Sequence, residues 1–173
     1  MASVVFMRGV NVGGHKAFRP SELARRLESL GVKSIGAAGT FVVGADLPEP
    51  DVRRQFAKQI PFETELMICS KRDLASLVAL RPFEAKALPK SDGQYVTVVT
   101  RAPRALPKLP LDAPVGKDWQ VRVIAIHRIF LVSLARRVGS KLLYPNEVVE
   151  RQLGVAATTR NWSTILKLHE ALC

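Results

Sequence analysis

The sequence has few residues that could form a disulfide framework or a metal centre. Only two of its 173 residues are cysteines, Cys69 and Cys173, and they form neither a CxxC pair nor a disulfide pattern. A reducing compartment keeps such thiols free. The three histidines, His15, His127 and His169, are too scattered to predict a zinc site. We therefore expect no metal, no cofactor and no catalytic cysteine.

The sequence also lacks a long apolar run. Its most apolar stretch, residues 119–134, is interrupted by Arg122, His127 and Arg128, whereas a membrane span needs roughly 18 or more apolar residues. Residues 1–10 include Arg8 and show neither a basic leader nor a cleavage signal of small residues. These features predict a cytoplasmic protein with no membrane partner.

Acidic and aromatic residues are scarce. Lysine and arginine outnumber aspartate and glutamate by 26 to 15, and the resulting charge of +11 favours anionic partners such as nucleic acid or phosphorylated metabolites. Residues 101–141 hold nine basic residues against only Asp112 and Asp118. Aromatic residues make up just 6% of the chain, which is little for a surface that stacks bases. The charge therefore fits a solvated, solubilising surface as well as a nucleic-acid interface.

The hydrophobic content of 47% is sufficient for a core, and its pattern predicts the elements of the first half. β-Branched and aromatic runs predict strands at residues 3–7 and 65–69, and a strand at residues 32–43 that is interrupted or bulged around Gly36 and Gly39. Apolar residues at helical spacing predict helices at residues 21–30, after Pro50 to about Ile60, and at residues 70–80. Gly31 is the expected cap of the first helix, and Ser70 with Asp73 resembles a capping box at the start of the third.

The second half mixes strands and helices without strict alternation, which indicates an α+β fold. The pattern predicts a strand at residues 95–100, a hairpin of residues 119–125 and 129–134, and helices at residues 146–153 and 160–172. The connector at residues 101–116 contains four prolines and is not expected to form a helix or a central strand. The expected boundary between Pro82 and Gly93 gives subdomains at 1–86 and 87–173.

Two segments resemble a known family. The first is Met7-Arg8-Gly9-Val10-Asn11-Val12-Gly13-Gly14-His15, followed by a helix that ends Glu28-Ser29-Leu30-Gly31. The second is Leu153-Gly154-Val155, then Ala157-Thr158-Thr159-Arg160-Asn161-Trp162-Ser163-Thr164 and Ile165-Leu166-Lys167-Leu168. In this order they resemble the domain-of-unknown-function 1697 family. The resemblance implies two related ferredoxin-like α/β-sandwich subdomains, and it implies no established activity.

The chain departs from that family at one turn. Where such proteins typically carry Gln-Ser-Gly-Asn, this chain has Ala37-Ala38-Gly39-Thr40, which keeps the glycine and loses three polar groups. If the turn contributes ligand contacts in relatives, this chain is expected to bind a different ligand or none.

The amino-terminal loop is a candidate anion site, formed by Arg8, Asn11, Gly13, Gly14 and Lys16. Glycines let backbone amides approach an anion, and arginine and lysine add charge-assisted bonds to phosphate or carboxylate. The glycine spacing matches neither a P-loop nor GxGxxG. The alternative is that the two glycines form a tight turn that Asn11 caps.

The carboxyl-terminal segment is a second candidate, formed by Thr159, Arg160, Asn161 and Lys167. A helix N-terminus with an arginine favours anions, and Lys167 lies seven positions beyond Arg160, on the same face of the predicted helix. Alternatively, Thr158 or Thr159 only caps that helix.

Three functions remain open. The first is a module that binds a small phosphate- or carboxylate-bearing ligand between the two segments, with Lys141 either as a further contact or as part of an ordinary helix start. The second is non-specific nucleic-acid binding through the basic surface. The third is an enzyme of unknown reaction that uses His15 or Lys167 for proton transfer, without an identifiable partner residue. No GxSxG or similar signature points to a nucleophile, so whether the chain is an enzyme stays open.

Overall fold

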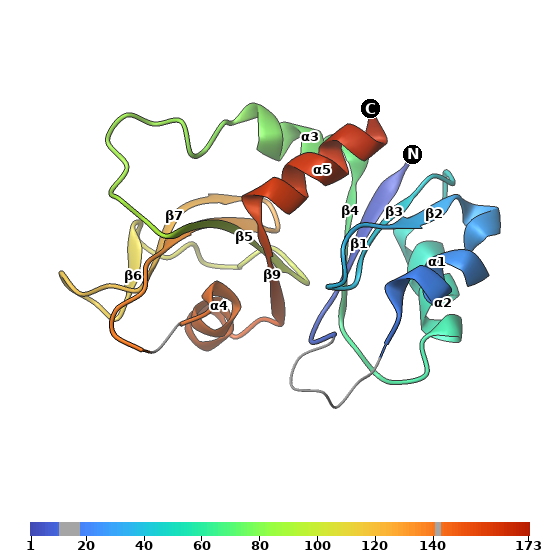
Figure 1. Ribbon diagram of the computed structural model, residues 1–173, viewed down its shortest axis with the longest axis horizontal. Coiled ribbons are helices and arrows are strands. Elements are labelled where there is room, and N and C mark those ends of the chain that lie inside the picture. Colours follow the sequence, from blue (N-terminus) through green and yellow to red (C-terminus); the bar gives the residue numbers. More distant parts are fainter. Residues whose placement is uncertain (11–17, 141–142) are drawn as a thin grey trace. The chain divides into compact units, whose positions relative to one another are not determined.

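The computed structural model describes residues 1–10, 18–140 and 143–173 (Figure 1). The chain falls into two compact units, one made of Met1–Ala75 with Leu166–Cys173 and the other of Ser76–Ile165. Each unit is built on an antiparallel sheet, so the predicted α+β class is confirmed. In the described ranges, no helix combines the length and the apolar character that crossing a bilayer requires. The boundary predicted at residues 86 and 87 stays a prediction.

The first unit has the element order βαββαβ. Its elements are β1 (Ser3–Met7), α1 (Pro20–Arg26), a 3-10 helix (Glu28–Leu30), β2 (Val32–Ser34), β3 (Thr40–Val43), α2 (Glu49–Gln59) and β4 (Leu66–Ser70). The strands lie in the order β2-β3-β1-β4, so β1 has a neighbour on both sides and is buried along its whole length. Since β1 ends at Met7, Arg8 directly follows a central strand.

The core of the first unit contains one face of this sheet and the apolar faces of α1 and α2. Side chains alternate along β1, and Val5 belongs to the same buried cluster as Leu23, Leu27 and Phe56 from the helical segments. Leu23 and Leu27 are four residues apart, which places them on one helical face. The ring of Phe56 meets that of Phe41 edge-on, with 5.4 Å between centroids.

The segment predicted as one interrupted strand is instead a hairpin. β2 and β3 pair antiparallel, and Gly36 and Gly39 lie between them with φ angles of 70° and 68°. A Cβ atom on Gly39 would lie 3.0 Å from the Cβ of Met7, so this position needs glycine for its backbone angle and for the close approach. The glycines therefore mark a reversal of the chain and not a bulge.

The predicted cap at Gly31 and the predicted capping box of Ser70 and Asp73 are both present in the structure. The helix predicted at residues 21–30 ends earlier, at Arg26, and the 3-10 helix continues to Gly31, which caps it at a φ of 63° as predicted. The predicted capping box is confirmed at the start of α3 (Lys71–Ala79). There the amide of Asp73 donates to the hydroxyl of Ser70 at 3.1 Å, and the amide of Ser70 donates to the Asp73 carboxylate at 3.3 Å.

The second unit repeats the strand order of the first with one different connection. Its elements are β5 (Gly93–Val99), β6 (Leu111–Ala113), β7 (Val121–His127), β8 (Phe130–Ala135), α4 (Pro145–Leu153) and β9 (Ala157–Asn161), followed by α5 (Trp162–Leu172). The sheet order is β6-β7-β8-β5-β9, so β7, β8, β5 and β9 correspond to β2, β3, β1 and β4. Helix α4, which lies against one face of the sheet in Figure 1, corresponds to α2. The proline-rich connector with edge strand β6 takes the place of α1.

The prediction of a helix at residues 160–172 was wrong at its start. Residues 157–161 form β9, which pairs with β5, and α5 begins only at Trp162. Thr158 and Thr159 therefore lie in a strand and do not cap a helix. Arg160 precedes α5, so it shares no helical face with Lys167. Local periodicity missed β9 because this strand is defined by pairing with a distant segment.

Candidate functional site

The structure describes five of the ten predicted site residues. It places Arg8 after β1 in the first unit, residues 159–161 on β9 in the second unit, and Lys167 on the part of α5 that belongs to the first unit. The other predicted residues lie outside the described residues: Asn11, Gly13, Gly14, Lys16 and Lys141. The meeting of the two predicted segments in one site stays a prediction.

The backbone of Arg8 is held by hydrogen bonds on both sides of β1. The amide of Met7 donates to the carbonyl of Gly39 at 2.8 Å, and the amide of Arg8 donates to the carbonyl of Glu65 at 3.0 Å. The hydroxyl of Thr64 donates to the carbonyl of Arg8 at 2.7 Å. Arg8 is nevertheless an exposed residue, so a fixed backbone carries a solvent-accessible cation.

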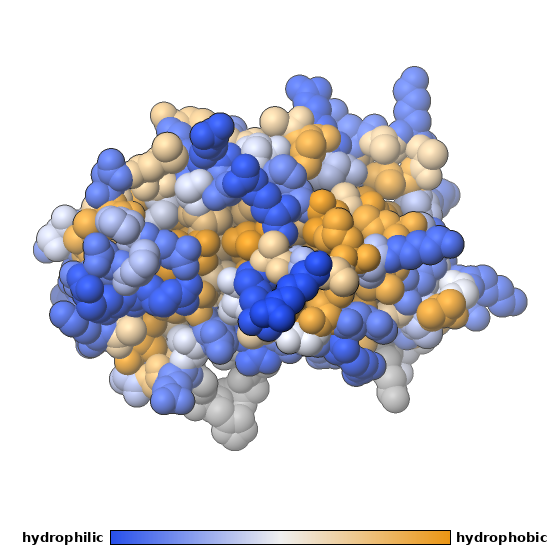
Figure 2. All heavy atoms as spheres, turned by 180° about the vertical axis from the view of Figure 1, so that it is seen from behind, coloured by the Kyte–Doolittle hydropathy of each residue, from blue (hydrophilic) through white to orange (hydrophobic). Residues whose placement is uncertain are grey.

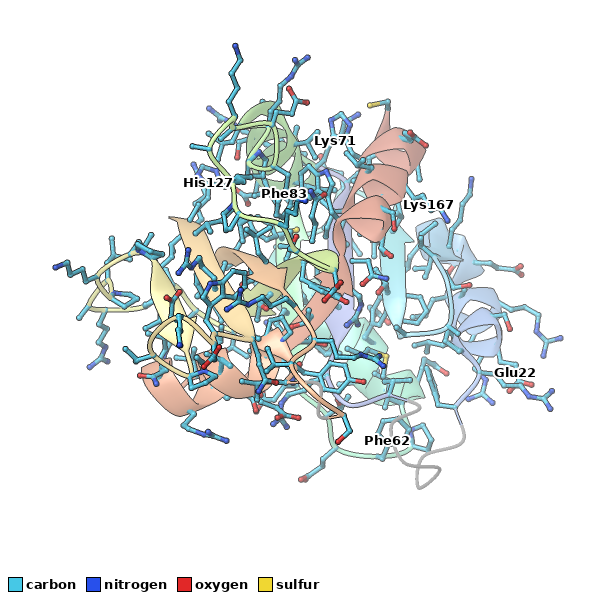
Figure 3. The ribbon with its side chains drawn as sticks, turned by 60° about the vertical axis from the view of Figure 1, so that its left-hand side comes forward. Glu22, Phe62, Lys71, Phe83, His127 and Lys167 are labelled. Carbon is cyan, nitrogen blue, oxygen red and sulfur yellow. The ribbon has the colours of Figure 1, made fainter. Side chains whose placement is uncertain are left out.

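A hollow of about 740 Å³ lies beside Arg8, and we call it the first-unit hollow. Its other lining residues come mainly from the segment that joins α2 to β4, including Ile60, Pro61, Phe62, Glu63 and Glu65. The chain leaves the helix at Ile60, whose ψ is 123°, because a following proline disfavours helical backbone. Phe62 is labelled on this segment in Figure 3.

The apolar wall of this hollow is supported from behind. The ring of Phe62 packs edge-on against that of Phe18, with 5.6 Å between centroids and an interplanar angle of 83°. Pro61 lines both the first-unit hollow and a second hollow of about 340 Å³, to which Glu22 and Arg26 also contribute. The two hollows thus adjoin at Pro61.

Among the residues that the structure describes, the lining of the first-unit hollow includes the cation of Arg8, the carboxylates of Glu63 and Glu65, and an apolar wall. The volume of this hollow falls in the range of roughly 300–1,000 Å³ that small-molecule sites occupy. The guanidinium of Arg8 suits a carboxylate or a phosphate. Sequence reasoning selected Arg8 as a candidate and did not select residues 60–65, because no motif marks them. The available signal was an aromatic residue, Phe62, between a proline and a glutamate just after a helix.

Neighbouring residues of β9 point to opposite faces of the sheet, which separates Thr159 from Arg160. The Thr159 hydroxyl lies 2.8 Å from the hydroxyl of Thr97 on β5. Arg160 is only 7% exposed, and its Nη1 donates to the Thr158 hydroxyl at 2.7 Å and to the Thr159 carbonyl at 2.9 Å. Burial lowers the pKa of Arg160 to about 10, so the side chain is a buried cation at neutral pH.

Two arginines of the second unit, Arg122 and Arg136, make contacts within that unit. The guanidinium carbons of Arg122 and Arg136 lie 4.6 Å and 4.1 Å from the ring centroid of Trp119, which is 3% exposed. Arg122 also makes a two-point ion pair with Asp112, at 2.6 Å and 2.7 Å. The guanidinium of Arg136 donates to the carbonyls of Trp119 and Lys117. The tryptophan is therefore covered and does not present a face for base stacking.

Residues 1–125 match the family described as "Protein of unknown function (DUF1697)". The chain belongs to this family. The matched range includes the amino-terminal segment that carries the resemblance and ends before β9. The DUF1697 description names no activity, so membership leaves the chemistry to be argued from the residues.

A solved structure has a fold similar to that of this DUF1697 member. The conserved bacterial protein SP0830 from Streptococcus pneumoniae is 18% identical in sequence, and the match covers 99% of this chain and 98% of that chain with a TM-score of 0.64. At this identity the similarity shows a shared fold alone. No curated protein matches the chain.

The structure also brings together a serine and a histidine that sequence reasoning did not connect. The Oγ atom of Ser76, on α3, lies 2.8 Å from Nε2 of His127, which is labelled at the end of β7 in Figure 3. Ser76 lies inside a helix, whose amides are engaged by the helix itself and offer no oxyanion site. In the first unit, burial raises the pKa of the Cys69 thiol, and Asp73 raises it further, which suppresses the thiolate. Neither Ser76 nor Cys69 is therefore favoured as a nucleophile.

Proposed function

We propose that this DUF1697 member is a binding module for a small carboxylate- or phosphate-bearing ligand, which it takes in the first-unit hollow with Arg8 as the cationic contact. The observation that carries the proposal is the presence of that hollow beside the one described arginine of the amino-terminal segment. Because backbone bonds to Glu65 and Thr64 already fix Arg8, ligand binding has to order little more than its side chain.

The proposal keeps the remaining predicted residues as sources of further contacts. Asn161 at the end of β9 and Lys167 on α5 are exposed and can meet a ligand without unfolding. Thr159 and Arg160 are more engaged within the second unit, through the bonds to Thr97, Thr158 and the β9 backbone. The proposed set is completed by the residues outside the described ranges: Asn11, Gly13, Gly14, Lys16 and Lys141.

We expect Arg8→Ala to weaken the binding of hexanoate at least about tenfold, because a hydrogen bond to a charged group contributes about 1.5–3 kcal/mol. Hexanoate is the probe because it joins a carboxylate to an apolar chain that Phe62 and Ile60 can contact. Calorimetric titration with hexanoate and with inorganic phosphate measures the effect, and thermal shift provides a second readout.

Arg26→Ala is the matched control for this experiment, because it removes the same charge from the neighbouring hollow. It is expected to leave hexanoate binding unchanged. The proposal is wrong if neither anion binds the wild type, or if Arg8→Ala binds both as tightly as the wild type does.

The strand order supports a further proposal, that both units are variants of the ferredoxin-like fold. The first unit has the βαββαβ sequence of elements and the antiparallel order β2-β3-β1-β4. The second unit keeps the equivalent order β7-β8-β5-β9 and replaces its first helix by the proline-rich connector. On this proposal the subdomains divide at residues 86 and 87.

Nucleic-acid binding has less support than ligand binding. Arg101, Arg104 and Lys108 are exposed on the connector and can contact phosphates, but Trp119 is covered by two arginines. Figure 2 shows hydrophilic side chains interspersed with hydrophobic ones on the face that it draws. Tight binding to single-stranded or duplex oligonucleotides that falls steeply with salt would reverse this preference.

The enzyme alternative rests on His15 and Lys167. His15 lies outside the described residues, and Lys167 is exposed on α5. In the pair of Ser76 and His127, the histidine is a base beside the serine hydroxyl. The helix that carries Ser76 offers no amides for an oxyanion site. We therefore propose no reaction.

A further inference from the structure

We propose that the proline-rich connector of the second unit, residues 101–116, docks on a lipid surface that carries negative charge, with Leu106 and Leu109 entering the apolar layer and neighbouring cations meeting the headgroups. The proposal rests on observations of the second unit and is independent of the first-unit hollow. The sequence-based expectation of no membrane partner rested on the lack of an apolar span, which a segment that lies on the surface does not need.

The connector exposes apolar side chains that the core of the second unit does not use. Leu106 is 71% exposed, Leu109 is 36% exposed and Val115 is 92% exposed. Leu111, on β6, packs against the buried core instead. Of the eight large apolar side chains that are exposed in the described ranges, three therefore lie within ten residues. Single exposed leucines are common on protein surfaces, whereas such a concentration is typical of a surface that meets an apolar partner.

Three cations precede or separate these leucines in the sequence: Arg101, Arg104 and Lys108. All three are exposed, and within the described residues their side chains form no ion pair and no hydrogen bond. Residues 101–110 hold no carboxylate. The next carboxylate along the chain, that of Asp112, accepts two hydrogen bonds from Arg122, at 2.6 Å and 2.7 Å. The positive charge of this segment is therefore open to an anionic partner.

The backbone of this segment is restricted before any partner binds. Pro103 and Pro107 lie between the cations and leucines, and each proline fixes its own φ angle. Both ends of the segment are held by the second sheet: the amide of Thr100 donates to the carbonyl of Ala156 at 3.1 Å, and β6 pairs with β7 at the edge of the sheet (Figure 1). A segment with few accessible conformations loses less entropy when it docks.

The combination of leucines and cations favours a lipid surface over nucleic acid. Nucleic acid offers phosphates to the cations but no apolar layer to the leucines, and residues 101–110 include no aromatic side chain for base stacking. A bilayer with anionic headgroups supplies both kinds of partner. Arginine and lysine keep their charged ends at the level of the headgroups while their apolar stems lie along the layer that leucines enter.

Co-sedimentation with vesicles measures the docking, using phosphatidylcholine vesicles with and without about 30% phosphatidylglycerol. The wild type is expected to bind only the anionic vesicles and to bind them less tightly as the salt concentration rises. Arg104→Gln/Lys108→Gln is expected to weaken binding about 25-fold, because each cation near such a surface strengthens binding about fivefold. Leu106→Ser/Leu109→Ser is expected to weaken binding at least about tenfold, because it removes the apolar anchors.

Two control variants remove similar groups elsewhere and leave the connector intact. Lys33→Gln/Lys58→Gln removes two exposed cations of the first unit, and Leu80→Ser removes a leucine that is 54% exposed just after α3. Both controls are expected to bind the anionic vesicles within about threefold of the wild type. Circular dichroism of all variants shows whether each has kept the fold.

Three outcomes overturn the proposal. The first is a wild type that fails to bind anionic vesicles at about 50 mM salt, whether or not it binds a single-stranded oligonucleotide through the same cations. The second is a folded Leu106→Ser/Leu109→Ser variant that binds as tightly as the wild type, which would show adsorption by charge alone. The third is a wild type that sediments as a dimer while this leucine variant sediments as a monomer, which would assign the leucines to a second copy of the chain.

Discussion

Replacement of Trp119 by alanine is expected to lower the free energy of unfolding by about 3–5 kcal/mol, the usual range for truncating a buried aromatic residue. The indole is 3% exposed, so its removal leaves a cavity that the surrounding chain can only partly fill. It also removes the ring on which Arg122 and Arg136 stack, and with it the favourable interaction between each guanidinium and the aromatic face.

Urea unfolding followed by circular dichroism measures this loss. Trp119→Phe is the matched control: it keeps an aromatic face for the two arginines and is expected to cost clearly less than the alanine variant. A loss below about 1 kcal/mol for Trp119→Ala would contradict the buried position of the ring and would reopen its use as a stacking surface.

Replacement of Arg160 by methionine is expected to raise the free energy of unfolding by about 1–3 kcal/mol at pH 7, because apolar residues of similar volume often stabilise a site that held a buried charge. Burial lowers the pKa of Arg160 to about 10, the direction expected when desolvation disfavours the charged form. Methionine has a similar length and carries no charge to desolvate.

The difference in unfolding free energy between Arg160→Met and the wild type is expected to change with pH in one direction. Between about pH 10 and the higher pKa of an arginine in the unfolded chain, the unfolded state binds the proton more strongly than the folded state. The wild type therefore gains stability relative to Arg160→Met as the pH rises through that window. Below pH 10 the cost of the buried charge is fully present, so the advantage of the variant is greatest there and shrinks at higher pH.

Urea unfolding of both proteins from pH 7 to pH 11 tests this expectation. Arg101→Met is the control, because Arg101 is exposed and its replacement is expected to change stability by less than about 0.5 kcal/mol. A variant less stable than the wild type at pH 7 would show that the hydrogen bonds of Arg160 outweigh its desolvation. A stabilised variant would show that the charge costs the fold stability, as expected of a side chain that serves binding.

The parts of the fold that were predicted correctly depend on residues close together in the chain. The capping box of Ser70 and Asp73 and the cap at Gly31 are contacts across three or four residues, and the structure shows both. The hairpin of β7 and β8 turns at residues 128 and 129, close to the turn that was predicted near His127 and Arg128. Such features are encoded by neighbours, so a sequence pattern is enough to identify them.

The errors occurred where a distant partner decided the backbone. The last two residues of Ala157–Asn161 were assigned to the well-patterned helix that follows, but pairing of the whole segment with β5 makes it a strand. Gly36 and Gly39 mark a bulge or a reversal equally well in a sequence, and the close approach of Met7 to Gly39 belongs to the hairpin arrangement. In both segments the energy of strand pairing overrode local preference.

The residues of the candidate site also fall into one that the sequence pattern indicated and several that it did not. Arg8 was predicted as a ligand contact from its place after a buried strand, whereas Phe62, Glu63 and Glu65 attracted no notice because they form no motif. They line the hollow with Arg8 because β4 pairs with β1 and leads the preceding segment back to the end of that strand.

The amino-acid sequence by itself determined the α+β class, most helix ends, the family and the choice of Arg8, because periodicity, capping and motif spacing are carried by residues near one another in the chain. Only the tertiary structure decided that Thr158 and Thr159 lie in a strand, that Trp119 is covered by two arginines, and that two glutamates share a hollow with Arg8. These outcomes depend on strand pairing and on burial, whose energies arise between segments that the chain sequence keeps far apart.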